Sequence, residues 1–353
     1  MACAKMENFF LGHWYSASLT RFSCLLLPFS WVFILVSKLR YCFYHFIPGM
    51  QKKVSVPVIV VGNITVGGTG KTPLVMMLVE KFQEMGFKPG VVCRGYGAKL
   101  KSPCHVNDSM NTDLAGDEAV EVASVTGCPV VAFPDRVSAC QRLIELGCTI
   151  IISDDGLQHY RLHRDIEIAL IDGQRLLGNG YCLPAGPLRE PKSRLYSVDR
   201  IVITQGDNNH EEVLKKLNLD CSFFQMSIAP EKIVSVSNQN VAMSFNDARE
   251  KNWAVVTGIG NPHRFIKTLD GLKIKQVEQR FFSDHHKFSQ EEIDFGPNAW
   301  VIMTHKDAVK CQTFVKDRHW CLMVKPRLDT EFFSNLAQHK IFGLGTVQKN
   351  IHR

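Results

Sequence analysis

Residues 58–72 read VIVVGNITVGGTGKT, an apolar run followed by a glycine-rich segment that ends in a lysine and a threonine. A short run of branched apolar residues is typical of a strand that is buried on both faces. The next residues have the apolar period of a helix that ends at Gly86, and its apolar face consists of Leu74, Met77, Leu78 and Phe82. A strand, a glycine loop and a helix in this order predict a P-loop, which binds the phosphates of a nucleotide.

The glycine-rich segment has the chemistry that a triphosphate needs. Its glycines let backbone N–H groups point at phosphate oxygens, and the N-terminus of the following helix adds partial positive charge. The Lys71 ammonium would reach the β and γ phosphates, and the Thr72 hydroxyl would bind Mg²⁺. Thr65 stands where the strict pattern has a glycine, and a glycine-rich turn without a ligand is the alternative. The residues predicted to bind the nucleotide are Gly67, Gly68, Thr69, Gly70, Lys71 and Thr72.

Short apolar runs alternate with helical periods along the chain. The runs predicted as strands of the first half are residues 57–61, 129–133, 149–152, 168–171 and 201–203. They predict an α/β fold, with a P-loop NTPase-like domain whose parallel sheet is covered by helices. The chain turns polar after residue 206, and two later runs, residues 253–260 and 300–304, predict a second, smaller α/β domain. The predicted units are residues 1–50, 51–206 and 207–353.

Two acidic segments are candidates for chemistry beside the P-loop. Asp154 and Asp155 follow the apolar residues 149–152, at a strand end where a carboxylate would hold Mg²⁺ directly or through water. An Asp-Gly turn is the alternative. Asp117 and Glu118 open a predicted helix, where acidic residues usually serve the helix dipole. Spacing alone favours that structural interpretation, and the position between the P-loop and Asp154 leaves a catalytic one open.

Several loops carry side chains suited to an anionic acceptor. α/β enzymes bind ligands in the loops at strand ends, and a solvated loop is the alternative for each candidate. The candidates are Tyr96, Gln158, His159 and Arg189. Further along, residues 284–286 read DHH, and a capping box at residues 289–292 predicts that this histidine pair lies in a loop just before a helix.

Charge and cysteine content exclude several classes of protein. The 353 residues carry a formal net charge of +7, of which the first 53 contribute +5, six basic residues against one acidic. The rest of the chain is close to neutral, so a nucleic-acid partner is not expected. The 12 cysteines contain no C-x-x-C pair and lie mostly in apolar runs. They predict small buried side chains in a reducing compartment, and neither a zinc site nor a disulfide framework.

The N-terminal segment is apolar and flanked by cations. Residues 22–36 have no charge, and Arg21, Lys38 and Arg40 flank them together with tryptophans and tyrosines. A span needs about 20 residues, and Pro28 interrupts this shorter run. The pattern favours a helix in the headgroup interface, with a true span and an ordinary buried helical hairpin as alternatives. No small-residue cleavage site follows, so a signal peptide is not expected.

These motifs follow one another in a specific order. They are residues 61–73, 94–97 (RGYG), 116–118 (GDE), 154–159 (DDGLQH), 183–190 (LPAGPLRE) and 284–286 (DHH). In this order they resemble the tetraacyldisaccharide 4'-kinases of lipid A synthesis, from the apolar N-terminus to about Lys310. Two positions depart from the family pattern. Cys93 stands where serine is more common, and His305 stands where glutamate is usual.

The resemblance implies two α/β/α domains with the active site between them. It also implies transfer of the γ-phosphate of ATP to the 4'-hydroxyl of a tetraacylated glucosamine disaccharide 1-phosphate. Asp117, aided by His285 of the second domain, would remove the proton of that hydroxyl. The implied cofactors are ATP and Mg²⁺, and the implied metal ligands are Thr72, Asp154, Asp155 and Glu118.

The implied partners are a lipid substrate and a membrane. Tyr96, Gln158, His159 and Arg189 would bind the acylated disaccharide. The N-terminal helix would rest on the cytoplasmic face of the bacterial inner membrane, because a lipid with four chains does not leave the bilayer. A monomer is expected.

A membrane-docked P-loop GTPase or metal-insertion ATPase is the main rival interpretation. Residues 304–307 read THKD, a weak match to the guanine-reading pattern N/T-K-x-D in which His305 takes the place of lysine. Such a GTPase would hydrolyse GTP without an acceptor. A membrane-associated nucleotide binder that transfers no phosphate is the third interpretation.

Overall fold

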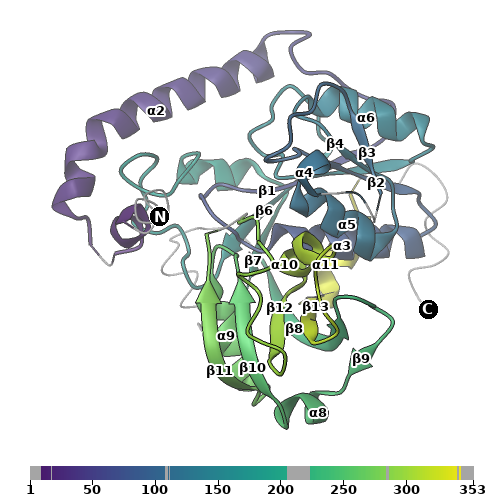
Figure 1. Ribbon diagram of the computed structural model, residues 1–353. Helices are drawn as coiled ribbons and strands as arrows, with labels where there is room; N and C mark the ends of the chain where they lie inside the picture. Colours follow the sequence, from purple (N-terminus) through teal and green to yellow (C-terminus); the bar gives the residue numbers. More distant parts are fainter. Residues whose placement is uncertain are drawn as a thin grey trace.

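The computed structural model describes residues 9–16, 18–107, 110, 112–204, 223–283, 286–339 and 342. A short helical segment, residues 9–14, precedes the long helix α2 (Figure 1). The elements of the first half are α2 (Arg21–Phe46), β1 (Val58–Asn63), α3 (Lys71–Glu84), β2 (Pro89–Cys93), β3 (Cys104–Val106), α4 (Thr112–Ala115), α5 (Asp117–Thr126), β4 (Val130–Ala132), α6 (Arg136–Glu145), β5 (Ile150–Asp154), β6 (Ile166–Asp172), the 3-10 turn η1 (Lys192–Ser197) and β7 (Arg200–Thr204). Those of the second half are β8 (Phe224–Ser235), β9 (Ala242–Met243), α8 (Phe245–Arg249), β10 (Asn252–Thr257), α9 (Pro262–Gly271), β11 (Lys275–Phe281), β12 (Trp300–Thr304), α10 (His305–Cys311), β13 (His319–Leu328) and α11 (Thr330–Ala337).

The described strands pair into one continuous sheet. Its order is β11-β10-β12-β13-β8-β7-β6-β1-β5-β2-β4-β3, and β9 pairs with β8. In the first half β1, β2, β4, β5, β6 and β7 pair in parallel. The apolar runs predict all of these strands except β2. The long strand β8 joins the halves, because it is parallel to β7 and antiparallel to β13.

The central strand β1 is buried on both faces, which explains its unbroken apolar sequence. Val58 and Val60 point into one apolar cluster, while Ile59 and Val61 point into the other. Helices α3 and α5 cover the face of Ile59, and α6 covers the opposite face. The parallel α/β fold predicted from the sequence is confirmed, with helices on both sides of the sheet.

The second half repeats this layering on a smaller scale. Alternate residues of β10 and β12 enter two clusters, one completed by α9 and the other by α10. The C-terminal α11 returns to the first half, where Phe332 and Leu336 join the cluster beneath α3. The boundary predicted near residue 206 lies outside the described residues, and the division into units at residues 50 and 206 stays a prediction.

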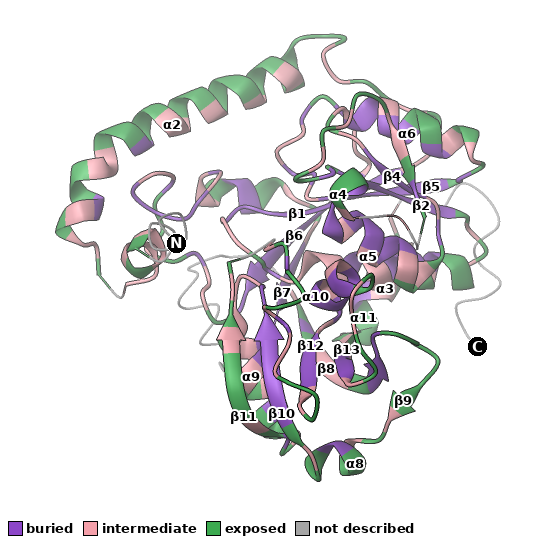
Figure 2. Cartoon of the chain, viewed as in Figure 1, coloured by how far each residue is buried: buried purple, intermediate pink, exposed green. Residues whose placement is uncertain are grey.

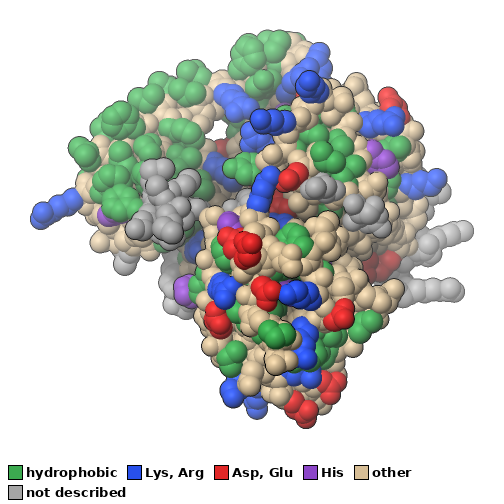
Figure 3. Space-filling view, viewed as in Figure 1, with side chains coloured by type: hydrophobic (Ala, Val, Ile, Leu, Met, Phe, Trp, Pro, Cys, Tyr) green, Lys and Arg blue, Asp and Glu red, His purple; other side chains and the backbone are tan. Residues whose placement is uncertain are grey.

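The helix α2 has an unusual distribution of side chains. It runs from Arg21 to Phe46 as one helix with Pro28 inside, longer than the predicted apolar segment, and its buried residues are Ser23 and Ser30. Most of the helix is exposed or half-buried (Figure 2), and hydrophobic side chains cover its surface (Figure 3). They include Leu25, Phe29, Trp31, Val32, Leu35, Val36, Leu39, Phe43 and Phe46. The alternative of an ordinary buried hairpin is therefore wrong.

The capping box predicted at residues 289–292 forms without a helix. The Ser289 N–H donates to Glu292 Oε2 (2.9 Å), and the Glu292 N–H donates to Ser289 Oγ (3.3 Å). The chain makes only a turn there. Gly296 then adopts a positive φ of 90° and Pro297 follows, and both residues disfavour a continuing helix. The predicted helix is wrong, although its capping contacts are present.

Gly62, at the end of β1, is a position where only glycine fits. A Cβ there would lie 2.7 Å from Leu157 Cγ and 3.0 Å from the Leu157 backbone nitrogen. We predict that Gly62→Ala lowers the free energy of unfolding by about 1–3 kcal/mol through overpacking. Gly271→Ala is the matched control, because nothing lies within 4 Å of its Cβ, and it should change stability by less than about 0.5 kcal/mol. Urea denaturation measures both, and equal effects would contradict the prediction.

Candidate active site at the P-loop and the cleft beside it

The P-loop enters α3 through glycines in the left-handed region. Gly67 and Gly70 have φ of 103° and 85°, which other residues adopt only with strain. Asn63 Nδ2 donates to the Gly67 carbonyl (3.2 Å), and Thr204 Oγ1 donates to the Thr69 carbonyl (3.0 Å). These bonds engage loop carbonyls from outside the loop, so the loop conformation is fixed by its neighbours.

A second loop, residues 182–189, pairs with the start of the P-loop. The Val66 N–H donates to the Pro187 carbonyl (2.8 Å), and the Arg189 N–H donates to the Ile64 carbonyl (2.7 Å). Thr65 forms an antiparallel bridge with Leu188. This pairing explains why threonine replaces the first glycine of the strict pattern, since strand-like backbone needs no glycine.

The N-terminal helices hold the same second loop. Ser30 Oγ of α2 donates to the Cys182 carbonyl (2.9 Å) and accepts from the Ala185 N–H (3.0 Å). Trp14 Nε1 donates to the Pro184 carbonyl (2.9 Å). The apolar helix is therefore connected to the phosphate loop through one intervening segment.

Two cations converge on Asp155 next to the P-loop. Lys71 Nζ lies 3.4 Å from Asp155 Oδ1 and also donates to Asn63 Oδ1 (3.3 Å). Arg189 Nη1 lies 3.1 Å from Asp155 Oδ2. Burial by itself would raise the pKa of Asp155, but the charges of Lys71 and Arg189 outweigh it and hold that pKa at about 2. The site therefore presents positive charge where phosphates would enter.

Asp154, one residue earlier, is in the opposite situation. Its carboxylate is buried, and its Oδ1 has no hydrogen-bond partner among the described residues. Burial first, and then the charge of Glu118, raise the pKa of Asp154 to about 7. Two neighbouring carboxylates with an unsatisfied oxygen provide what Mg²⁺ requires.

The donor set around Asp154 fits a magnesium site shared with a nucleotide. No group of three or more His, Cys, Asp or Glu side chains that could hold a metal occurs within the described part of the chain. Mg²⁺ in phosphate-transfer sites usually takes one or two carboxylates and completes its shell with phosphate oxygens and water. Asp154 and Glu118, with the hydroxyl of Thr72 at the start of α3, match that composition.

Asp117 lies at the start of α5, beside Glu118. Gly116 before it has a φ of 89°, and a Cβ there would lie 3.0 Å from the Tyr96 carbonyl oxygen. The Asp117 side chain is only 7% exposed, and its Oδ1 accepts from the Glu118 N–H (3.0 Å). Its Oδ2 lies 3.5 Å from Lys310 Nζ and 3.8 Å from Lys306 Nζ, both on α10. The second half of the chain thus supplies the cations that face Asp117.

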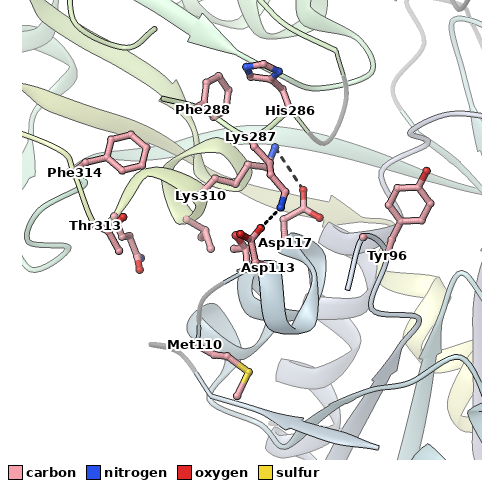
Figure 4. A pocket seen from close by; sticks show the side chains of 14 residues that line it. Tyr96, Met110, Asp113, Asp117, His286, Lys287, Phe288, Lys310, Thr313 and Phe314 are labelled. Atoms are coloured by element: carbon pink, nitrogen blue, oxygen red, sulfur yellow. Dashed lines mark ion pairs between the residues drawn. The ribbon is translucent and has the colours of Figure 1, made fainter. Parts of the chain in front are cut away.

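Asp117 borders a cleft of about 340 Å³ (Figure 4). The first half contributes Tyr96, Asp113 and Met110 to its walls, and the second half contributes residues 286–288 and the end of α10. His285, the predicted partner of Asp117, and Asp284 before it lie outside the described residues. Their sequence neighbours His286 and Lys287 line this cleft.

The structure brings most of the other predicted site residues to one of these two places. Tyr96 is 63% exposed at the wall of the cleft. Gln158 Nε2 donates to the Asn63 carbonyl (3.0 Å) and to Glu190 Oε1 (2.6 Å), close to the P-loop. His159 differs, because its Nε2 bonds the carbonyl of Pro134 (2.9 Å).

The sequence reasoning missed the cations of α10. Residues 304–307 were considered as a guanine-reading pattern, and neither Lys306 nor Lys310 was predicted to have a role. The signal was present, because Thr304 and Asp307 have the spacing of a helix cap after a buried strand. His305, the departure from the family pattern, is buried with its Nδ1 3.4 Å from Glu121 Oε1 of α5. It therefore adds another contact between α10 and α5.

The fold and site define an α/β phosphotransferase of the P-loop type. The family model described as tetraacyldisaccharide-1-P 4'-kinase matches residues 22–341. A tetraacyldisaccharide 4'-kinase of Legionella pneumophila (strain Corby) is 41% identical over 336 residues, 94% of this chain and 98% of the relative. That of Vibrio vulnificus is 43% identical over 323 residues, 90% of each chain.

A solved structure agrees with these relatives. LpxK of Aquifex aeolicus, in a crystal structure in complex with ATP, is 30% identical with a TM-score of 0.74, over 91% of this chain and 99% of that chain. The chain belongs to the tetraacyldisaccharide 4'-kinase family, and it is a kinase of lipid A biosynthesis.

His159 gives a pH-dependent test of this region. Burial, and then the charge of Arg136, lower the pKa of His159 to about 4. The unfolded chain binds a proton at its ordinary pKa near 6.5, so stability falls as the pH falls from about 6.5 to 4. His159→Gln keeps a donor for Pro134 but does not titrate. We predict that the variant loses about 1–3 kcal/mol less stability across this window than the parent protein. Urea denaturation at pH 7 and pH 4.5 measures this, and equal losses would refute it.

Proposed function

We propose that this chain transfers the γ-phosphate of ATP to the 4'-hydroxyl of a tetraacylated glucosamine disaccharide 1-phosphate, with Asp117 as the general base. One observation carries the assignment of roles. The phosphate loop, the Asp154–Glu118 carboxylate pair and the Asp117 cleft follow one another along a single edge of the sheet. Lys71 contacts Asp155, and the charge of Glu118 raises the pKa of Asp154. Asp117 is the residue before Glu118.

The proposed chemistry begins with the position of the acceptor. A hydroxyl in the cleft gives its proton to the Asp117 carboxylate, and its oxygen forms a bond to the γ-phosphorus. The bond from that phosphorus to the β–γ bridging oxygen breaks, and ADP leaves. Phosphoryl transfer depends on positioning and charge stabilisation more than on covalent participation of the protein. Lys71 and Arg189 would leave Asp155 to contact the charged phosphate oxygens.

The metal site is part of this proposal. Thr72, Asp154 and Glu118 would hold Mg²⁺, with Asp155 contributing directly or through water. When bound there, Mg²⁺ would supply positive charge that neutralises part of the charge on the phosphate oxygens. The cleft walls, including Tyr96 and Lys287, would contact the sugar and phosphate groups of the acceptor, and His285 is proposed to assist Asp117.

The rival GTPase interpretation loses its support in the structure. In a guanine-reading motif the lysine and aspartate contact the base, and here the residues at both positions are engaged elsewhere. His305, which takes the place of the lysine, lies 3.4 Å from Glu121. Asp307 is buried and accepts hydrogen bonds from Thr257 Oγ1 and the Gly258 N–H. Lys306, between them, pairs with Glu118 (3.6 Å). Residues 304–307 therefore face α5 and β10 and present no guanine site.

A role for α2 at the membrane surface is the second part of the proposal. The helix is long and apolar enough to cross a bilayer by length and composition. We propose that it instead lies on the cytoplasmic face of the inner membrane. Ser23 and Ser30 are buried on one side while the large apolar side chains are exposed, so the helix has one protein-facing side and an apolar remainder. This arrangement is typical of an interfacial helix.

The general-base role makes a kinetic prediction. Asp117→Ala should lower kcat by at least about 100-fold with little change in KM for ATP, because general-base catalysis contributes about 10²–10⁴-fold. Lys71→Ala should weaken ATP binding as well as kcat. Radiolabelled ATP, the disaccharide 1-phosphate and separation of the lipid products measure both. Asp270→Asn, an exposed acid that pairs with Gln276, is the control. An undiminished kcat in Asp117→Ala would remove Asp117 from this role.

The membrane proposal is tested on the exposed face of α2. Deletion of residues 1–48 should release the protein from membranes, but it also removes the contacts of Trp14 and Ser30. A sharper variant combines Leu25→Gln, Val32→Gln and Leu39→Gln, which lie on the exposed face. We expect it to move to the soluble fraction, because each change removes roughly 1.5–3 kcal/mol of apolar burial. Ser30→Ala, the control, should stay with the membrane. Retention of the triple variant would refute the proposal.

A further inference from the structure

Residues 304–310 have no role in the chemistry described so far, yet they surround the buried charge of Asp307. They open α10 at the point where β12 ends. Thr304 Oγ1 donates to Asp307 Oδ2 (2.7 Å), and the Asp307 N–H is directed at Thr304 Oγ1 (3.3 Å). This reciprocal cap fixes the Asp307 side chain at the start of the helix. Lys310 follows one turn later.

Asp307 is 0% exposed, and both oxygens of its carboxylate have polar partners. Its Oδ2 also accepts from Thr257 Oγ1 (3.0 Å) and from the Gly258 N–H (3.1 Å), at the end of β10. Its Oδ1 lies 3.2 Å from Lys310 Nζ. A buried carboxylate is tolerated only when it is paired and hydrogen-bonded. Asp307 is therefore an anchor that fixes the ammonium of Lys310.

Lys310 stands between this anchor and the proposed general base. Its side chain is 6% exposed, and its Nζ lies 3.5 Å from Asp117 Oδ2. Figure 4 marks this ion pair with a dashed line. The same ammonium lies 5.6 Å from the centroid of the Phe288 ring, in the segment that lines the cleft. One cation is thus shared by a carboxylate of α5 and a carboxylate of α10.

We infer that Lys310 is a positioning residue of the phosphoryl transfer, which Asp307 anchors and which holds the Asp117 carboxylate in place against the acceptor hydroxyl. The inference rests on the proposed role of Asp117. A reacting group displaced by about 1 Å can lose about 100-fold in rate, so the anchor has a kinetic consequence. When Asp117 takes up the proton, Lys310 keeps Asp307 as its counter-charge.

Lys306 contributes less to this positioning. It lies 3.8 Å from Asp117 and 3.6 Å from Glu118, and its side chain is more exposed than that of Lys310. A purely structural role for Lys310, in which the ion pairs only hold α10 against α5, is the competing explanation. That explanation predicts that the variants lose stability, with no selective loss of kcat over KM.

The first experiment measures kcat and KM of the full chain in detergent, which separates a positioning role of Lys310 from a purely structural one. Lys310→Met should lower kcat at least about tenfold, while KM for ATP stays within about twofold. Lys310→Arg, which keeps a cation, should recover most of the kcat. Lys325→Met is the matched control, because Lys325 also pairs across the halves, with Glu80 at 3.3 Å, but on an exposed surface. A kcat of Lys310→Met within twofold of the parent protein, or no recovery with arginine, would overturn the inference.

A second variant keeps the test decisive if Lys310→Met is unstable. Asp307→Asn combined with Lys310→Met removes both members of the buried pair, so no unpaired charge remains on Asp307. We expect its thermal midpoint to recover while its kcat stays low, and recovery of kcat together with the midpoint would overturn the inference. The activity of the parent protein shows whether the inference alone fails or the proposed function fails as well. If the parent forms no phosphorylated lipid the proposed function fails, and if only the variants deviate the inference fails alone.

Discussion

The pairing of the phosphate loop with residues 182–189 is the interaction on which the rest of the site depends. Bonds from Val66 to Pro187 and from Arg189 to Ile64 give the loop a strand-like start, and the same pairing delivers the Arg189 guanidinium to Asp155. Because Ser30 and Trp14 bond to that second loop, the exposed apolar helix and the phosphate cradle share one support. The exposed apolar surface of α2 and the phosphate loop are thereby held in a fixed relation.

The carboxylates of the site differ in whether a cation pairs with them. Asp155 is balanced by two cations, and Asp307 and Asp117 share the ammonium of Lys310. Asp154 differs, since its carboxylate is buried beside Glu118 with an oxygen that no described residue satisfies. An uncompensated buried carboxylate costs folding free energy. Mg²⁺ at the site proposed above would offset that cost.

The sequence predicted the central layers well and the edges poorly. The runs at β1, β4, β5, β6 and β7 are apolar throughout because helices cover both faces, and such runs can be recognised without a structure. Strands β8, β11 and β13 were not predicted, because they are partly exposed and carry charges or proline. Strands β3 and β9 were not predicted because they are only three and two residues long. Strand β2 was also not predicted, although it is buried. Lys71 and Asp154 received their predicted roles from local motifs, whereas the local pattern favoured a structural role for Asp117 and the family resemblance implied the catalytic one. Lys310 was missed because its role depends on a contact with a residue 193 positions earlier, which no local pattern contains.

The most direct test of the account is a crystal structure with a non-hydrolysable ATP analogue and the disaccharide acceptor. The account predicts a terminal phosphate in the cradle of residues 67–70, with Lys71 moved from Asp155 to that phosphate. The Asp117 carboxylate would lie within hydrogen-bond distance of the acceptor hydroxyl, still contacted by Lys310. A terminal phosphate that points away from Asp117, with Lys71 still paired to Asp155, would contradict it.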